Sequence, residues 1–211
     1  MRLWSETFRD GGLIPAETAF AEIDPASRVR LAGNRNPHLA WDEVPTGTAS
    51  LALFCFDPDA PQDASLANRD DREVPLAAPR GDFYHWSLLD MPPAMHAIDA
   101  GQFSSGITPR GKAAGSGPLR QGINDYTAWF AGDAAMAGDY YGYDGPCPPW
   151  NDARIHHYIF RLYALDVPRL ALPERFTGQQ AHAALYGHIL DEAQLVAAYS
   201  LNPGLALTLK K

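Results

Sequence analysis

Positive charge, cysteine and long apolar runs are all scarce in this sequence of 211 residues. It has 17 Lys and Arg residues against 25 Asp and Glu residues, for a net charge of −8. No basic stripe is therefore available to displace counterions from a nucleic acid, and adhesion to anionic membranes is disfavoured. No segment offers the roughly 20 apolar residues that a membrane-spanning helix needs. We expect no nucleic-acid partner and no integral membrane association.

Cysteine is limited to Cys55 and Cys147, which excludes a disulfide framework. The first ten residues lack the apolar core of a secretory signal, so the cytoplasm is the expected location. Cys55 lies in an apolar run and is expected to be a buried small hydrophobe. Cys147 lies between two prolines, and its thiol is either structural or reactive.

What is present describes a globular protein, with 46% apolar and 20% charged residues. The 18 prolines and 18 glycines are spread along the chain and mark no linker, so we expect a single domain over residues 1–211. Apolar runs at 51–56, 83–89 and 155–165 have the length and composition of buried strands and end at turn residues. Shorter strands are expected at 29–31 and 38–41.

A helix is predicted over residues 177–190, where Thr177 can act as the cap and Ala181, Leu185 and Ile189 share a face. The segment 195–200 either closes this helical region or forms a late strand. Many short strands with one or two C-terminal helices indicate a mostly β protein, a β-sandwich with helices at one end. The polar segment 62–80 is interpreted as a long surface loop.

Three polar clusters follow or interrupt the predicted strands. The first is Asp57-Pro-Asp-Ala-Pro61, which taken alone is a turn whose carboxylates accept backbone N–H groups. The second is His85, an imidazole among aromatic residues. A lone imidazole of this kind is usually a core residue.

The third cluster is the run 144–158. Its prolines exclude a central strand or helix there and form a rigid loop that leads to His156, His157 and Tyr158. Side chains alternate across a strand, so only one of the two histidines faces inward. We expect His156 to be that residue. Between the prolines and the histidines, Trp150-Asn-Asp has the composition of a plain surface turn.

Several passages, in this order, make the chain resemble the phosphatidylethanolamine-binding protein family, in its bacterial Raf-kinase-inhibitor-like branch. The passages are Ser5-Glu-Thr-Phe-Arg-Asp-Gly-Gly-Leu-Ile-Pro15, Asn36-Pro-His-Leu-Ala-Trp-Asp-Glu-Val-Pro45, Asp57-Pro-Asp-Ala-Pro61, His85-Trp86, Gly145-Pro-Cys-Pro-Pro149 and His156-His-Tyr158. They cover nearly the whole chain. The Asp-Pro-Asp turn combined with the proline loop is a highly specific pair of motifs.

The resemblance implies a two-sheet, antiparallel β-sandwich with a small pocket that binds anions and phosphorylated groups. Carried over position by position, the residues expected to bind ligand are Asp57, Asp59, His85, Gly145, Pro148, Pro149, His156 and Tyr158. His157 stands where the family usually has arginine, and it should face away from the pocket. The lengthened segment 62–80 is a second departure, with a bearing on access to the pocket.

Two functions from different classes remain open. The first is a cytoplasmic binding protein for a small anion or phosphorylated ligand, without cofactor, metal or catalytic residue. The resemblance adds modulation of a kinase or protease partner, lipid binding and a homodimer. The alternative is a metal-dependent or His/Asp hydrolase that uses Asp57, Asp59, His85 and His156. No metalloprotease helix motif or nucleophile elbow supports the alternative, and we favour binding over catalysis.

Overall fold

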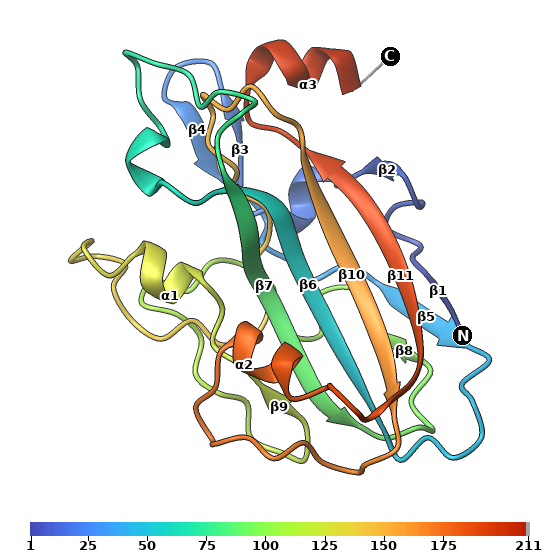
Figure 1. Ribbon diagram of the computed structural model, residues 1–211. Helices are drawn as coiled ribbons and strands as arrows, with labels where there is room; N and C mark the ends of the chain where they lie inside the picture. Colours follow the sequence, from blue (N-terminus) through green and yellow to red (C-terminus); the bar gives the residue numbers. More distant parts are fainter. Residues whose placement is uncertain (210–211) are drawn as a thin grey trace.

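The computed structural model describes residues 1–209, and strands dominate it (Figure 1). The prediction of a mostly β protein is confirmed. The largest sheet has the strand order β2-β11-β10-β6-β7-β9. In that order the strands span Gly12–Leu13, Ile189–Tyr199, His156–Leu165, Ser50–Pro61, Arg80–Met91 and Arg120–Gln121. All neighbours pair antiparallel except β2 and β11, which are parallel.

Two smaller sheets accompany the large one. A three-stranded sheet has the order β1-β5-β8, with β1 at Arg2–Trp4, β5 at Leu39–Asp42 and β8 at Ala97–Ile98. A two-stranded ribbon consists of β3 (Ala21–Asp24) and β4 (Arg28–Leu31). In Figure 1 the three-stranded sheet lies behind the large sheet, which is the two-layer arrangement of a sandwich.

The side chains of β6 point alternately to the two faces of the large sheet, and on each face they pack against a different layer. Leu51, Leu53 and Cys55 face the core between the two sheets, where they join Trp41 of β5. The intervening residues, including Phe54, face the opposite side of the sheet and pack in a second cluster beneath α2 (Gly178–Ala183). Because a strand that is buried on both faces needs apolar residues at every position, the run 51–56 shows no polar alternation.

The β6 strand continues beyond its predicted end. The strand was expected to stop at Asp57-Pro58, but β6 pairs with β7 as far as Pro61, with a shift of register between Asp57 and Ala60. An irregularity of this kind accommodates a proline within a strand and redirects the neighbouring side chains. The Asp-Pro-Asp segment is therefore part of the sheet and not a turn after it.

The predicted helix at 177–190 is correct in its start and wrong in its length. Thr177 caps α2 in a capping box with Gln180, but the helix ends at Ala183. Ile189 belongs to β11, which extends from there to Tyr199 and pairs with β10 along its length. The segment 195–200, for which helix and strand were both open, is thus mostly strand.

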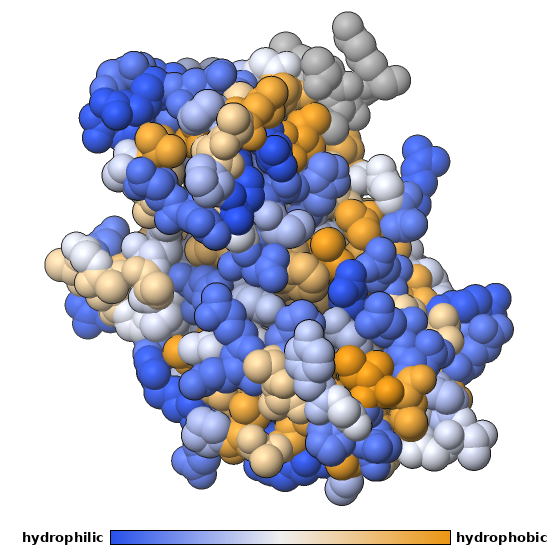
Figure 2. All heavy atoms as spheres, in the orientation of Figure 1, coloured by the Kyte–Doolittle hydropathy of each residue, from blue (hydrophilic) through white to orange (hydrophobic). Residues whose placement is uncertain are grey.

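The remaining helices are short. They are α1 at Tyr126–Trp129, α3 at Pro203–Leu209 and two 3-10 turns, η1 at Ala16–Thr18 and η2 at Ala64–Leu66. None of the helices within residues 1–209 is long and apolar enough to cross a bilayer. Hydrophilic residues cover much of the face in Figure 2, and hydrophobic ones lie in separate groups between them.

The surface loop 62–80, between β6 and β7, is largely exposed but is fastened to the body of the protein. The Asn151 side chain accepts the Asn68 N–H and donates to the carbonyls of Leu66 and Arg72. Val74 is fully buried and forms a β-bridge with Asp152. The loop is thereby joined to the segment that follows the prolines.

Candidate functional site

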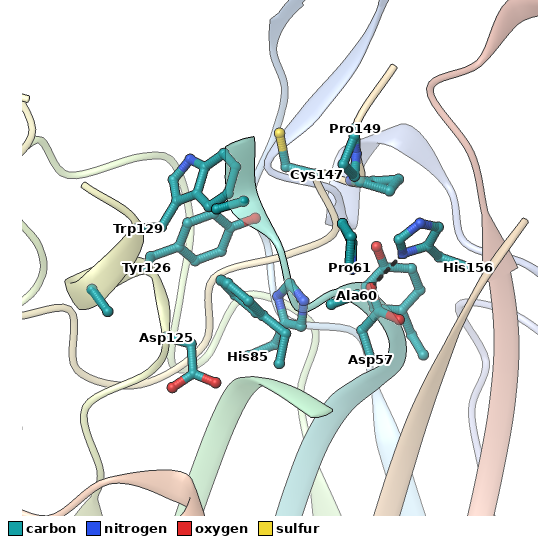
Figure 3. Close-up of a pocket in the computed structure, with 15 residues that line it drawn as sticks. Asp57, Ala60, Pro61, His85, Asp125, Tyr126, Trp129, Cys147, Pro149 and His156 are labelled. Carbon is teal, nitrogen blue, oxygen red and sulfur yellow. Dashed lines mark hydrogen bonds and ion pairs between the residues drawn. The ribbon is translucent and has the colours of Figure 1, made fainter. Parts of the chain in front are cut away.

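A cavity of about 490 Å³ lies where β6, β7 and β10 meet α1 and the proline loop, residues 145–149. Figure 3 shows side chains from all these elements around it. The residues predicted to bind ligand divide into two groups. Those that line the cavity are Asp57, His85, Pro148, Pro149, His156 and Tyr158. Asp59 and Gly145 lie outside the lining.

His85 presents one ring nitrogen to the cavity. Its Nδ1 lies 2.7 Å from the main-chain oxygen of Asp144. Since a carbonyl only accepts, Nδ1 carries the proton and the neutral ring leaves a lone pair on Nε2. No hydrogen bond within residues 1–209 reaches this Nε2. Burial lowers the pKa of His85, so the ring is neutral near pH 7.

The buried Asp144 side chain forms several hydrogen bonds, and these fix the main-chain oxygen that His85 contacts. Its carboxylate accepts hydrogen bonds from Asn34 at 2.7 Å and Asn124 at 2.8 Å and pairs with Lys112 at 2.7 Å. Three donors hold the side chain, and the main-chain oxygen is thereby fixed in position for His85. The orientation and the tautomer of His85 therefore follow from contacts made behind the cavity.

His156 is held in a different way, because both of its ring nitrogens are occupied. Nδ1 lies 2.6 Å from Asp57 and Nε2 lies 3.0 Å from Asp152. Burial opposes a charge on this ring, but the two carboxylates outweigh that effect and raise the pKa of His156 to about 9. The ring is an imidazolium at neutral pH, and neither nitrogen is left for a ligand.

Both oxygens of the Asp57 carboxylate also accept a hydrogen bond. Its Oδ2 takes the His156 bond, and its Oδ1 accepts the Asp59 N–H at 2.8 Å. Asp152, on the other side of His156, pairs with Arg80 at 2.5 Å. Two carboxylates and two cations thus alternate in one buried row of side chains. The net charge of these four groups is close to zero.

Asp59 faces away from the cavity. It accepts from His157 Nδ1 at 2.8 Å and from Arg154 at 3.0 Å. Burial favours the neutral acid, but these hydrogen bonds outweigh it and hold the pKa of Asp59 below its usual value. His157, with 52% of its side chain exposed, lies on the opposite face of β10 from His156.

Gly145 lies where the backbones of two segments approach closely, and only glycine fits there. A Cβ at this position would lie 2.0 Å from the Thr18 carbonyl oxygen. The Gly145 N–H donates to Asn34, and its carbonyl accepts the Tyr126 hydroxyl at 2.7 Å. Glycine therefore allows the start of the proline loop to pack against Thr18, and Gly145 itself lies outside the lining that later residues of the loop form.

Asp152 is the residue that the sequence interpretation placed wrongly. Trp150-Asn-Asp was expected to be a plain surface turn, but Asp152 is only 1% exposed and joins His156 to Arg80. Burial raises its pKa, yet the bonds from His156 and Arg80 prevail and hold it low. No pattern in the sequence marks this pair, because a spacing of four residues brings two side chains together on a helix and this segment is not helical.

Aromatic residues of the lining were also not identified from the sequence. Phe83 comes from β7, and Tyr126 and Trp129 come from α1. Nothing in the sequence links these segments, because the contacts between them are made only in the folded chain.

Cys147 lines the cavity as well. Burial raises the pKa of its thiol to about 12, which keeps it protonated and weakly nucleophilic. Within residues 1–209, no three His, Cys, Asp or Glu side chains are arranged to hold a metal ion.

Comparisons with known proteins agree with this fold. The family described as phosphatidylethanolamine-binding protein matches residues 4–200. A UPF0098 protein of Methanothermobacter thermautotrophicus is 32% identical over 200 residues, covering 94% of this chain and 98% of the relative. The Escherichia coli UPF0098 protein YbhB is 28% identical over 200 residues, covering 95% of this chain and 100% of the relative.

Two solved structures share the fold. E. coli YbcL, described as a member of the mammalian PEBP family, has a TM-score of 0.67 at 22% identity, with 94% of this chain and 97% of YbcL covered. The Chlamydia trachomatis homologue CT736 has a TM-score of 0.60 at 26% identity, with coverage of 94% and 96%. With a family match over almost the entire length and relatives of the same size, this chain belongs to the phosphatidylethanolamine-binding protein family.

Proposed function

We propose that this protein binds the oxyanion group of a small ligand, a phosphate or a carboxylate, at the floor of the cavity. The observation that carries the proposal is a pair of polar atoms on buried side chains that have no hydrogen-bond partner within residues 1–209. One is Nε2 of His85, and the other is the Tyr158 hydroxyl, which has no hydrogen-bond partner among the residues that the structure describes. The two rings lie 5.2 Å apart, centroid to centroid.

Buried polar groups without partners are costly, and a ligand that completes their hydrogen bonds recovers that cost. The Tyr158 hydroxyl can donate to an oxyanion. His85 can accept a proton from an acid, or donate once it is protonated, because Nδ1 is committed to Asp144. An anion beside the ring favours the imidazolium, so binding is expected to be coupled to proton uptake.

Asp57 does not oppose an anion at this position. Both of its oxygens are occupied, and the His156 imidazolium balances its charge. His156 is accordingly assigned a positioning role: it fixes Asp57 and the beginning of β10, and Tyr158 follows two residues later on the same face. This role replaces direct contact with the ligand, which the sequence interpretation had assigned to His156.

Pro148 and Pro149 form a wall whose conformation is largely set before binding, which limits the entropy lost when a ligand is held. The proposal concerns the anion alone. Modulation of a kinase or protease, a homodimer and the hydrolase alternative stay predictions from the sequence.

The test is a calorimetric titration with inorganic phosphate and with phosphoethanolamine. We expect wild-type protein to bind at least one of them at millimolar concentration or below, and His85→Ala to lose at least tenfold in affinity, about 1.4 kcal/mol. His157→Ala is the matched control, because that imidazole lies outside the cavity, and it should bind like wild type. Absence of binding to wild type, or equal binding to both variants, would overturn the proposal.

A further inference from the structure

The cavity is much larger than the anion proposed for it. Pockets of about 300–1,000 Å³ typically enclose drug-sized ligands, and this one measures about 490 Å³. An oxyanion at His85 and Tyr158 contacts only the floor. The rest of the cavity is available for the remainder of the ligand, and its walls indicate what that remainder is.

The walls above the floor are apolar. They are formed by Pro61, Ala64, Phe83, Trp129, Pro148 and Pro149. A polar or charged arm would lose its hydration there without gaining hydrogen bonds, whereas an apolar arm gains by leaving water.

The acids of the lining are not placed to receive a cation at the floor. Asp57 has both oxygens bonded, as described above. Asp125 accepts the Tyr84 N–H at 2.7 Å, and its carboxylate points away from the other labelled side chains in Figure 3. Both acids of the lining already accept hydrogen bonds from the protein, so neither is an unpaired carboxylate that an ammonium group on the arm would satisfy.

Trp129 supplies a flat apolar surface at the mouth of the cavity. Its helix, α1, is anchored through Tyr126, which stacks on Phe20 at 4.7 Å and on Phe130 at 5.5 Å. Trp129 itself takes part in no aromatic ring pair within residues 1–209, and it is 42% exposed. In Figure 3 its indole lies across the cavity from Pro149, with His85 below and between them.

We infer that the ligand is an organic acid with a flat apolar arm, such as an aryl phosphate or an aryl carboxylate. The inference rests on the proposed anion site. The acid group lies at His85 and Tyr158, and the ring lies between Trp129 and the proline wall. Stacking of a ring on an exposed indole at a concave site is a common source of binding energy.

The experiment compares four probes by calorimetry: inorganic phosphate, phosphoethanolamine, phenyl phosphate and hexyl phosphate. Phenyl phosphate is expected to bind at least about tenfold more tightly than inorganic phosphate, equivalent to about 1.4 kcal/mol. It should also bind more tightly than hexyl phosphate. Phosphoethanolamine should gain nothing over inorganic phosphate.

Trp129→Ala is expected to remove most of the advantage of phenyl phosphate and to leave inorganic phosphate unchanged. Trp129→Phe should retain part of the advantage, which separates loss of the ring from damage to α1. Trp4→Ala is the matched control, because Trp4 is also 42% exposed and lies on β1, away from the cavity lining. It should bind all four probes like wild type.

The outcomes separate this inference from the anion site itself. If inorganic phosphate binds and phenyl phosphate binds no more tightly, the flat arm is wrong and the anion site stands. Preference for phosphoethanolamine or hexyl phosphate over phenyl phosphate overturns the inference in favour of a cationic or a flexible arm. If no probe binds, the anion site fails and this inference fails with it.

Discussion

His85 and His156 line the same cavity and are nearly equally buried, yet they are in opposite states. His85 contacts a backbone carbonyl with one nitrogen, stays neutral and keeps the other nitrogen available. His156 contacts a carboxylate with each nitrogen, is charged and keeps none. Burial alone pushes both rings towards the neutral form, so the difference comes entirely from the partners.

The comparison shows that a histidine at a pocket is not by itself a ligand-binding group. A ring between two acids is a structural cation, and its contribution is to stability and to the shape of the site. A ring bonded to a carbonyl is available for chemistry, and its contribution is to binding. Experiments that separate stability from affinity therefore test the contrast directly.

The largest expected effect is the loss of stability in His156→Ala. The substitution leaves the Asp57 and Asp152 carboxylates buried without the cation between them, and removal of one partner from a buried charge cluster typically costs about 3–5 kcal/mol. Urea denaturation measures the free energy of unfolding. His157→Ala is the control and should cost less than about 1 kcal/mol, since its pair with Asp59 is half exposed. Equal losses of unfolding free energy in the two variants would contradict the structural role assigned to His156.

The next effect is the pH dependence of stability. The pKa of His156 is about 9 in the folded protein, against 6.5 for a histidine without these partners. Because the folded pKa is the higher one, the stabilisation is complete below about pH 6.5 and is lost as the pH rises through 9, with a total on the order of 3 kcal/mol. Denaturation between pH 6 and pH 10 should show this decline. A decline of the same size in His156→Gln would contradict the assignment.

A smaller effect is expected in the binding of sulfate, whose charge is constant between pH 5 and pH 8. Since an anion favours the imidazolium form of His85, affinity should rise as the pH falls, by up to about tenfold per unit above the pKa of the ring. Calorimetry at several pH values measures the slope. His85→Asn should flatten it, and an unchanged slope would assign the proton to another group.

The smallest effect is expected for Tyr158→Phe. Loss of one hydrogen bond to the ligand should weaken phosphate binding by about 1 kcal/mol. The free energy of unfolding should stay the same or rise slightly, because the hydroxyl is buried without a partner among residues 1–209. A clear loss of stability would show that the hydroxyl is bonded in the free protein.

Local patterns in the sequence were sufficient to predict the three long strands β6, β7 and β10, but not the short strands β1, β2, β3, β8 and β9. The runs 51–56, 83–89 and 155–165 were found because each is apolar and ends near a turn. The boundaries were less predictable, since they depend on the neighbouring strand. Pairing with β7 carries β6 past Pro58, and pairing with β10 takes Ile189 out of the helix that Thr177 begins. Neither partner is visible in a local window.

The candidate site was predictable only in part, for a related reason. The motif resemblance identified Asp57, His85 and His156, and the alternation of side chains separated His156 from His157. Asp152 and Asp144 could not be recognised as buried, because a polar residue in a turn has the same composition whether it is solvated or enclosed. Asp144 leaves one nitrogen of His85 free, whereas Asp152 helps to occupy both nitrogens of His156, and this difference becomes visible only in three dimensions.

The fastening of the surface loop 62–80 has a practical consequence for protein engineering. Its middle, residues 69–71, is exposed, and its ion pairs are of the kind that contribute little. An epitope or fluorescent tag inserted there would leave the cavity intact. The same tag placed between Val74 and Arg80 would disturb the contacts of both residues with Asp152. Through Asp152 it would also disturb His156. The loop thus contains one segment that tolerates insertions and another in which insertions affect the binding site.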